Sequence, residues 1–600
     1  MRTFIVGGLI LVFFAVQLMR GGSALRTVDG DGSGYYAYLT AVFVHGTTDF
    51  TPVFETEKGR RSLDYMGHYF HPFEGKLINK YYLGSALLML PFFLLAWLYS
   101  IITGMPPDGY NILYQYAVSL GAAVYAAIGL LATKRFLMLS GLPRGIGLIT
   151  IILLIFGTNL FFYTFLHPSH SHVYSFAAIA VFLLTARSFM LWERRRDFYF
   201  SMVLLGIIVL IRPSNAVIVL ILPFLAGTAQ QLKTVMLNLF KNNRLLIAGL
   251  VLFVAVFSLQ MLYNFLQTGH LILWSYRNEG FHFSQPALLS FLFSYRKGFF
   301  IYTPVMLLII PGLILLYHKS KYQFFTFAGF LGVLLYLLSS WWNWFFGDSF
   351  GMRAMIDFYP LLALPLAMFV SQLFSRKIGK LLLVTIAFPL LALNLLQTYQ
   401  YFSGIIHPDS MTKAKYWHVF LKTDKAYRNI FGSFPEPVYK SLEDATVLCY
   451  FNDMESPSLL WTSNGIQLSD DAYSGRYLAE MSQSNIYSPT LVLGKEQLGL
   501  TDQELYISVD LMYRELEKNA ATEALLVYAA SNLNGDLSFY KTFRLKQMPD
   551  QQLYIWRNAN FGFKVPAWTQ QTAEVKMYVW NTPVTNFQLD DFEVNIHILE

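Results

Sequence analysis

Long apolar runs recur along the first two thirds of this chain and then stop. Between Thr3 and Tyr399 they have about 17 to 25 residues each, enough for a helix to cross roughly 30 Å of hydrocarbon. Of the 600 residues, 55% are hydrophobic and only 14% are charged, which is outside the usual range of soluble globular domains. The pattern therefore predicts a polytopic α-helical membrane protein followed by a part of another kind.

The charged residues do not indicate a nucleic-acid partner, although the formal net charge is +7. The Lys and Arg residues lie in short clusters between apolar runs, as expected for cytoplasmic loops of a membrane protein. We therefore expect the lipid bilayer, and no nucleic acid, as the partner of the basic residues. The single cysteine, Cys449, excludes an intrachain disulfide and a cysteine-based metal site.

The first apolar run, residues 3–19, follows Arg2 and is interpreted as an uncleaved signal anchor. A signal peptide cleaved near 23–25 is the alternative, but the run is long and further spans follow it. The anchor leaves the N-terminus in the cytoplasm and residues 20–110 as a first outer loop. Residues 82–102 are apolar enough to span. Because spanning would place Arg194-Arg195-Arg196 outside, we predict that they lie along the outer interface.

This orientation requires residues 198–227 to cross as two short helices that break at Arg212-Pro-Ser-Asn215, since proline removes a helical hydrogen bond. About eleven crossings result, with the C-terminus outside a bacterial plasma membrane. The other predicted spans are 111–133, 145–165, 172–192, 246–265, 299–317, 323–341, 355–373 and 381–399.

Two carboxylates stand just beyond the first span, in Asp29-Gly-Asp31-Gly-Ser33-Gly34. This pattern matches the first half of a calcium-binding EF-hand loop, but Thr40 occupies the position of the bidentate glutamate. One carboxylate could instead act as a general base on a hydroxyl or amine. A plain Asp/Gly turn before a helix at Tyr35 is the third interpretation.

Other outer loops carry further candidate residues. Lys80 stands where a cation meets lipid phosphates, either specifically or by snorkelling to headgroups. His167, His170 and His172 fit a metal site, substrate hydrogen bonding or an interfacial polar cap. An aromatic belt explains the tryptophans of 341–353, but not Asp348 and Arg353, which are candidates for function. Because the chain has no phosphate-binding loop and no dinucleotide fingerprint, an energy-rich donor is expected to arrive through the membrane.

Five motifs, in this order, resemble those of GT-C glycosyltransferases over residues 1–400. The similarity is greatest to the branch that contains the protein O-mannosyltransferases and the aminoarabinose transferase of lipid A. The motifs are Asp31-Gly-Ser-Gly-Tyr-Tyr-Ala-Tyr-Leu39, Asn79-Lys-Tyr-Tyr-Leu-Gly84 leading to Leu90-Pro-Phe-Phe93, Ile211-Arg-Pro-Ser-Asn215, Arg296-Lys-Gly-Phe-Phe-Ile-Tyr-Thr-Pro304 and Gly347-Asp-Ser-Phe-Gly-Met-Arg353.

The resemblance implies transfer of a sugar from a polyprenyl-phosphate-linked donor to a glycan, lipid or protein acceptor on the outer face, without a cofactor or a metal. Asp31 matches the catalytic aspartate of the family better than Asp29, because it shortly precedes the aromatic pair Tyr35-Tyr36. Relatives often have a second acidic residue directly after that aspartate, where this chain has Gly32.

The resemblance also suggests binding residues. Lys80 matches a lysine that contacts the donor phosphate, and Arg353 is placed to do the same. His170 or His172 stands close to the position of an acidic residue in relatives. The remaining candidates for substrate binding are Tyr35, Arg212 and Asp348. A transporter or flippase and a ligase for lipid-linked glycans are the alternative functions, although neither internal repeats nor charges within spans are evident.

Residues 441–600 consist of short predicted strands separated by turn residues, which is typical of a β-sandwich, after a linker at 401–440 that contains Pro435-Glu-Pro437. Phe451-Asn-Asp-Met-Glu455, Trp461, Tyr473-Ser-Gly475 and Asp590-Asp-Phe-Glu593 resemble jelly-roll carbohydrate-binding modules. That resemblance implies sugar binding and a structural calcium between Glu455 and Asp591. A passive cap or docking domain is the other interpretation. The predicted strands are 446–450, 476–480, 506–512, 525–530, 553–556, 575–580 and 592–598.

Overall fold

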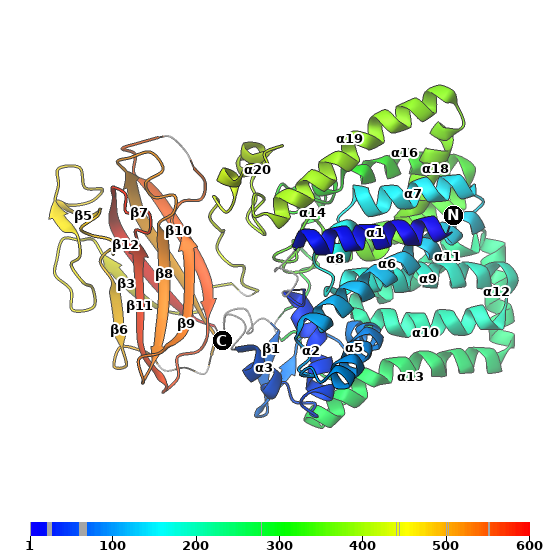
Figure 1. The fold of residues 1–600 in the computed structure, drawn as a ribbon, viewed down its shortest axis with the longest axis horizontal. Coiled ribbons are helices and arrows are strands. Elements are labelled where there is room, and N and C mark those ends of the chain that lie inside the picture. The colour runs from blue at the N-terminus through cyan, green and yellow to red at the C-terminus, as the bar shows by residue number, and fades with distance from the viewer. Residues whose placement is uncertain are drawn as a thin grey trace. The chain divides into compact units, whose positions relative to one another are not determined.

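The computed structural model describes residues 2–20, 27–58, 69–277, 279–439, 441–442, 445–499, 501, 503–549 and 552–599. The chain forms two compact units, Met1–Tyr399 and Gln400–Glu600 (Figure 1). The first is helical and the second is mostly β-sheet. The alternative cleavage site at 23–25 lies outside the described residues.

Seven helices in the described residues are long and apolar enough to cross a membrane, and a bent pair would make an eighth. The count of about eleven crossings is therefore not confirmed, because several predicted spans are shorter or broken. The seven are Gly84–Thr103 (α5), Ile112–Leu139 (α6), Ser171–Trp192 (α9), Asn243–Thr268 (α13), Lys321–Ser339 (α17), Arg353–Phe374 (η4 and α18) and Lys377–Phe402 (α19).

Two of the predicted spans are divided into shorter helices. The predicted span 145–165 is divided into α7 (Arg144–Gly157) and α8 (Leu160–Phe165) around Asn159. The Asn159 amide donates to Phe350 O (2.9 Å) and accepts from the Tyr359 hydroxyl (2.6 Å), so the break serves tertiary hydrogen bonds. The span 299–317 is likewise divided, into α15 (Phe299–Tyr302), η3 (Pro304–Leu308) and α16 (Ile309–Lys319).

The predicted break at Arg212 is confirmed. Helix α10 (Arg195–Ile211) ends there in extended backbone, with a φ of −152° at Arg212, and Pro213 begins the 3-10 helix η2 (Pro213–Ile221). The chain continues into α11 (Leu222–Ala226) and then bends by 116° into the amphipathic α12 (Ala229–Lys241). The second half of the predicted crossing is thus mostly a 3-10 helix.

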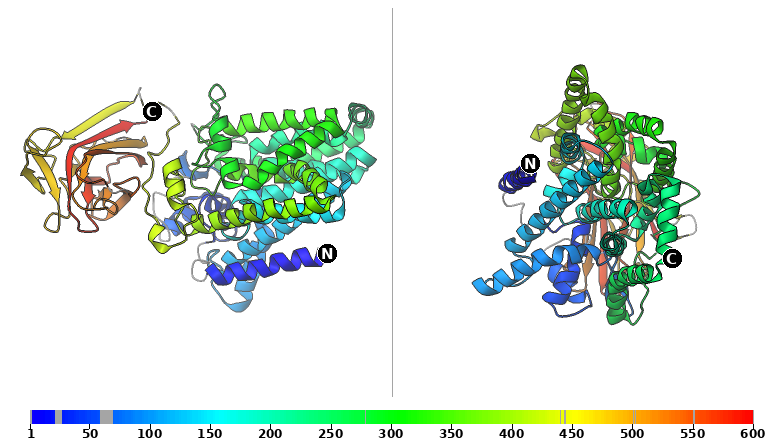
Figure 2. Two further views of the ribbon diagram at one scale, coloured as in Figure 1. Left: turned by 90° about the horizontal axis from the view of Figure 1, so that it is seen from above. Right: turned by 90° about the vertical axis from the view of Figure 1, so that its right-hand side faces the viewer.

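Helix α5 has a different course from the bundle. It packs against α2 (Asp31–Phe43), α6 and α10, and it runs crosswise to α9, α10 and α13 (Figures 1 and 2). Its length and composition would allow it to span. A crosswise course is what the predicted position along the outer interface requires, and that position remains a prediction.

Cysteine labelling can test the predicted orientation. In a Cys449→Ser background, a cysteine in place of the exposed Arg135 is expected to react with a membrane-impermeant maleimide only after permeabilisation, because residue 135 is predicted to be cytoplasmic. The parent chain is the control. Its exposed Cys449 is expected to react in sealed cells. Labelling at position 135 in sealed cells would contradict the topology.

Two helices approach each other closely at Gly312 in α16. A Cβ at this glycine would lie 1.9 Å from the carbonyl oxygen of Pro365 in α18 (Tyr359–Phe374). Gly312→Ala is therefore expected to separate the helices and to lower the free energy of unfolding by about 1–3 kcal/mol. Gly329→Ala in α17 is the matched control, since its Cβ would meet nothing within 4 Å. Melting of the purified variants, followed by intrinsic fluorescence in detergent, measures the difference.

The second unit contains two antiparallel sheets (Figure 1). One has the order β10-β7-β12-β5-β4, with β3 also paired to β12, and the other has the order β6-β11-β8-β9. Alternating buried positions on the long strands indicate a sandwich, as predicted. The strands are β3 (Thr446–Asn452), β4 (Ile466–Leu468), β5 (Tyr477–Met481), β6 (Leu491–Gly494), β7 (Leu505–Glu515), β8 (Leu525–Asn532), β9 (Leu537–Arg544), β10 (Arg557–Val565), β11 (Thr572–Trp580) and β12 (Phe587–Ile598).

Two sequence predictions about this unit were wrong. Residues 553–556 are not a strand, and β10 begins only at Arg557, where pairing with β7 starts. Residues 401–440 were expected to be a linker, but those described belong to the second unit, where they form α20 (Lys413–Val419) and pack on the sandwich. The ammonium group of Lys415 donates to Gly432 O (2.7 Å) and Gln547 Oε1 (3.0 Å), and Glu436 N donates to Gly562 O (2.7 Å).

Candidate functional site

Asp31 occupies the first turn of α2. Gly30 precedes it with a φ of +61°, and a carboxylate at a helix N-terminus is favoured by the helix dipole. The glycines that follow permit close packing. A Cβ at Gly32 would lie 1.9 Å from Ser169 Oγ, and one at Gly34 would lie 2.5 Å from the ring of Tyr81. The Gly-rich sequence thus positions Asp31 against two other segments of the unit.

The carboxylate of Asp31 forms an ion pair with Arg353, with 2.7 Å between Oδ2 and Nη1. Nη1 of Arg353 also lies 3.2 Å from His170 Nδ1. Because a guanidinium group only donates, His170 Nδ1 accepts and its Nε2 carries the proton in this arrangement. Burial alone would raise the pKa of Asp31, but the guanidinium group of Arg353 holds this pKa below its usual value. Asp31, in the predicted first outer loop, is therefore ionised at neutral pH.

A second buried cluster lies beside the first and is centred on Asp357. His172 Nδ1 donates to Asp357 Oδ1 (2.9 Å), and the Asn215 amide donates to Asp357 Oδ2 (2.7 Å). Arg212 Nη1 is 3.9 Å from the same Oδ2. Both clusters depend on η4 (Arg353–Phe358), which supplies Arg353 and Asp357 from a single buried turn. The ring of Tyr163 lies between them, 5.5 Å from each of the His170 and His172 rings.

Lys80 has a carboxylate partner that the sequence did not indicate. Its ammonium group pairs with Glu279, and the other Glu279 oxygen accepts from Trp342 Nε1 (3.1 Å). Lys80 also lies over the ring of Tyr276, 5.3 Å from its centroid. Tyr35, on α2, contacts the ring of Tyr81 at a tilt, with 4.5 Å between ring centroids. Lys80 and Tyr35 therefore flank the part of α2 that carries Asp31.

The structure thus brings together most of the residues selected from the sequence, namely Asp31, Arg353, His170, His172 and Arg212. Two candidates lie differently. Asp29 Oδ1 accepts from Gly30 N (2.9 Å) within the turn, which is the local role that an Asp/Gly turn predicts. Asp348 is exposed, and Asp357 is the buried carboxylate of this segment.

Sequence reasoning did not select Asp357, Asn215 or Glu279. Asp357 could have been selected, because it is a carboxylate at the start of an apolar run, four residues after Arg353. A charge at that depth requires a partner. Asn215 was part of a quoted motif. Glu279 lies in an irregular segment without periodicity, so only the folded structure reveals that it meets Lys80.

Metal binding gains no support from the side chains. Among the described residues, no group of three or more His, Cys, Asp or Glu is arranged to hold a metal ion. His170 and His172 instead contact Arg353 and Asp357. The calcium interpretation of the Asp29–Gly34 stretch is weakened in the same way, because the Asp31 carboxylate is occupied by a guanidinium group.

The acidic residues of the sandwich hold its strands together directly. Glu455 Oε1 accepts from Arg476 N (2.6 Å) and Tyr477 N (2.7 Å), and Asp591 Oδ1 accepts from the Ser474 hydroxyl (2.7 Å). Asp590, next in the chain to Asp591, accepts from Tyr473 N at 2.8 Å. These hydrogen bonds connect the turn at 473–477 to the ends of strands β3 and β12, and the calcium between Glu455 and Asp591 remains a prediction.

Asp590 makes the stability of this unit depend on pH. Burial raises the pKa of Asp590 to about 6, above the value of about 3.9 in an unfolded chain. The folded state therefore binds the proton more tightly, so this contribution is present below pH 4 and is lost as the pH rises to 6, by about 2 kcal/mol. Asp590→Asn is expected to remove the slope. Pulse proteolysis of the second unit in the full chain, at pH 4.5 and 7, measures it, and equal slopes would contradict the assignment.

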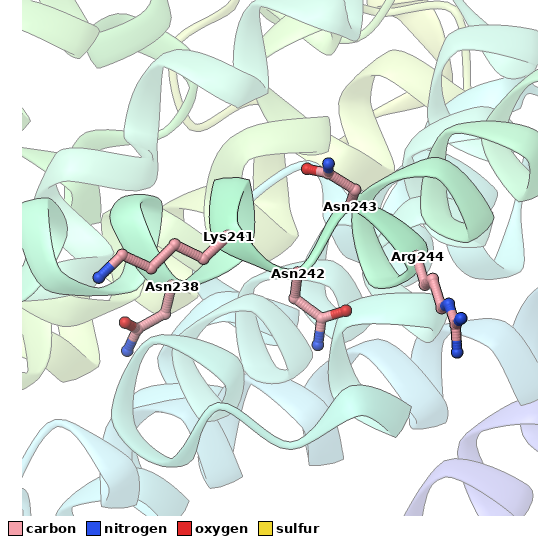
Figure 3. A pocket seen from close by; sticks show the side chains of 5 residues that line it. All are labelled: Asn238, Lys241, Asn242, Asn243 and Arg244. Atoms are coloured by element: carbon pink, nitrogen blue, oxygen red, sulfur yellow. The ribbon is translucent and has the colours of Figure 1, made fainter.

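A hollow of about 510 Å³ lies where α12 meets α13, and none of its lining residues belongs to the clusters around Asp31 and Asp357. Its walls are polar, and Figure 3 shows Lys241 and Arg244 extending away from each other. Because the two cations do not converge, the hollow lacks the arrangement of a phosphate site. It is lined by Asn238, Lys241, Asn242, Asn243 and Arg244.

No family model matches the chain, and no curated protein matches it. Similar solved structures include arabinosyltransferase EmbB from Mycobacterium smegmatis, with 11% identity and a TM-score of 0.30, over 82% of this chain and 59% of that one. Another is the CBM22-1 xylan-binding domain of Xyn10C from Paenibacillus barcinonensis, with 15% identity and a TM-score of 0.18, over 26% of this chain and 97% of that one. Similarities this weak do not support a functional argument.

Proposed function

We propose that this protein is a membrane glycosyltransferase that moves a sugar from a polyprenyl-phosphate-linked donor to an acceptor on the outer face of a bacterial plasma membrane. The ion pair between Asp31 and Arg353 carries the proposal. A carboxylate from the first outer loop meets a cation from a segment more than 300 residues away. This pairing provides a base and a phosphate-binding group at one place, and the sequence resemblance assigns the same two roles.

The chemistry requires little else. The acceptor oxygen attacks the anomeric carbon of the donor and loses its proton to the Asp31 carboxylate. The bond between the anomeric carbon and the phosphate oxygen breaks, and the lipid phosphate leaves with the electron pair. Arg353 and Lys80 stabilise the negative charge on that phosphate. No nucleotide or bound cofactor takes part.

The ion pairs of the substrate-free protein give this reaction an order. Arg353 is neutralised by Asp31, and Lys80 is neutralised by Glu279. A donor phosphate that takes over Arg353 removes the charge that lowers the pKa of Asp31, so the carboxylate becomes a stronger base once the donor is bound. The acceptor is therefore deprotonated only beside a bound donor.

The second cluster acts as support for the first. Asp357 receives hydrogen bonds from His172 and Asn215 and lies four residues from Arg353 on the same buried turn. Its contacts fix η4 and hence the direction of the Arg353 side chain. Tyr35 and Arg212 remain candidates for substrate contacts at the edge of the two clusters.

Transfer can be tested with membranes that contain the overproduced chain. Radiolabelled polyprenyl-phosphate sugars are added, and the product is analysed by mass in parallel with glycolipids from cells lacking the chain. A new glycosidic bond and a mass increase of one sugar are expected. Movement of labelled donor across the bilayer without a new bond would indicate a flippase, and addition of a preassembled glycan would indicate a ligase.

Sugar binding by the second unit is a separate proposal, which one surface favours. On the outer face of the four-stranded sheet, the Tyr487 ring lies 5.5 Å from Tyr578 and 6.3 Å from Trp580, between centroids. Tyr540 is exposed on the neighbouring part of this face, across from the small Ala529. Exposed aromatic rings beside small residues suit the apolar faces of sugar rings. We call these four aromatic residues the aromatic patch.

A further inference from the structure

A cavity of about 310 Å³ lies within the second unit, between residues 404–433 and the end of β9. Thr542, Phe543 and Arg544 form its floor on the sandwich side. The segment that was expected to be a linker forms the opposite wall, with Asn429 and Ser433 among its residues. The cavity therefore exists only because this segment packs on the sandwich.

The walls are held in place by described contacts. Asn429 N donates to Gly404 O (2.7 Å), and Ser433 Oγ lies 3.2 Å from His407 Nε2. Arg544 Nη1 donates to Thr522 O (2.9 Å), which directs the guanidinium group along the end of β9. The backbone of 429–433 is further tied to the sandwich by Gly432 N, which donates to Gln547 O (3.0 Å). The cavity is thus a partly open site whose walls are fixed by hydrogen bonds.

The chemistry of the lining fits a sugar. An amide, two hydroxyl groups and a guanidinium group can donate to or accept from ring hydroxyls, and Phe431 and Phe543 supply apolar surface. Among the described residues that line the cavity there is no carboxylate, and Arg544 carries the only fixed charge, so a neutral polyhydroxylated ligand suits it better than a polyanion. A volume of about 310 Å³ has room for one or two sugar rings.

A row of cross-strand neighbours leads from the aromatic patch to the cavity. Leu525, which lines the cavity, pairs with Trp580 on one side and with Arg544 on the other. This row crosses β11, β8 and β9 in turn, and β9 is the edge strand of the sheet. Residues 404–433 stand beyond that edge, so a glycan that follows the row from the patch meets a wall.

We propose that this cavity binds the terminal sugar of a glycan chain, so that the second unit recognises a chain end and not the middle of a polymer. The proposal rests on the sugar binding proposed for the aromatic patch. It adds an end wall, built by residues 404–433, which admits one terminal ring and blocks continuation of the chain. A unit of this kind would hold the end of the acceptor that a transferase extends.

The test measures binding of four neutral hexasaccharides, from β-1,4-xylan, β-1,4-mannan, β-1,4-glucan and α-1,5-arabinan, to the full chain in detergent by isothermal titration. The tightest binder is then compared with versions carrying a naphthyl cap at one end or the other. A cap on at least one end is expected to weaken binding at least tenfold. Binding that tolerates both caps, or no binding of any hexasaccharide, would overturn the proposal.

Variants locate the site. Thr542 is exposed in the cavity, and Thr542→Tyr is expected to fill the cavity and weaken binding at least tenfold. Asn429→Ala removes an amide from the wall and is expected to weaken binding to the same extent. Leu537→Tyr, at the exposed opposite end of β9, is the matched control and should bind normally. If Tyr578→Ala weakens binding while Thr542→Tyr and Asn429→Ala do not, the patch binds sugar and the cavity does not. The assay contains no polyprenyl donor, so its result is independent of the transferase proposal.

Discussion

Replacement of Asp31 by Asn is expected to reduce sugar transfer by about 10²- to 10⁴-fold, which is the usual contribution of a general base. Asparagine has the shape of aspartate and can still accept from Arg353, so the contact between α2 and η4 survives. It cannot take up the proton of the acceptor. Initial rates with lipid-linked sugar in membranes, at matched protein levels, measure the loss in kcat.

The same experiment separates the two carboxylates of the predicted first outer loop. Asp29→Asn is the control, because Asp29 accepts a hydrogen bond from Gly30 within its own turn and an asparagine oxygen can do the same. Its transfer rate is expected to remain within about threefold of the parent, since the half-buried turn keeps its hydrogen bond and so loses little stability. Unchanged transfer by the Asp31 variant would exclude Asp31 as the base.

Replacement of Asp357 by Ala is expected to lower the free energy of unfolding by about 3–5 kcal/mol, because it leaves buried groups without their charge partner. Asp357 is fully buried, and it accepts from both His172 and Asn215. Arg212, 3.9 Å from Asp357 Oδ2, would lose its nearest described carboxylate as well. Thermal unfolding in detergent, followed by intrinsic fluorescence, measures the change.

Asp348→Ala, nine residues earlier in the same outer segment, is the matched control. Asp348 is exposed, so its loss is expected to change the free energy of unfolding by no more than about 0.5 kcal/mol. If the two variants melt together, the cluster around Asp357 does not stabilise the unit. Asp357→Asn retains the acceptor for His172 and should fall between the two.

The broad architecture was accessible from the sequence, because it depends on signals that are local and strong. Apolar runs indicate spans whatever their partners are. Helix α10 ends at Ile211, just before Arg212-Pro213, because proline has no backbone N–H to continue the helical hydrogen bonds. The number of crossings was less accessible. Asn159 interrupts an apolar run and makes hydrogen bonds with Phe350 and Tyr359. The sequence near position 159 does not predict either partner.

The candidate site shows the same division. Asp31, Lys80 and Arg353 were selected from their positions beside apolar runs and from the resemblance to family motifs. Their pairing was not predictable, since the residues of each pair are roughly 200 or more apart in the chain. Strands β4, β6 and β9 of the sandwich were not predicted for a similar reason, because they are short or have few apolar positions and depend on their neighbours.

Under the proposed function, the paired cations have a consequence for selectivity among lipids. A bilayer offers many anionic phospholipids for each polyprenyl phosphate, and two unpaired cations in an outer-face site would attract all of them. Here Arg353 and Lys80 already have carboxylate partners, so an incoming phosphate must displace Asp31 or Glu279 before it gains a contact. A common phospholipid, which brings no sugar to fit the rest of the site, has little binding energy to set against that displacement. The carboxylates thus favour binding of the sugar-bearing donor over binding of common phospholipids.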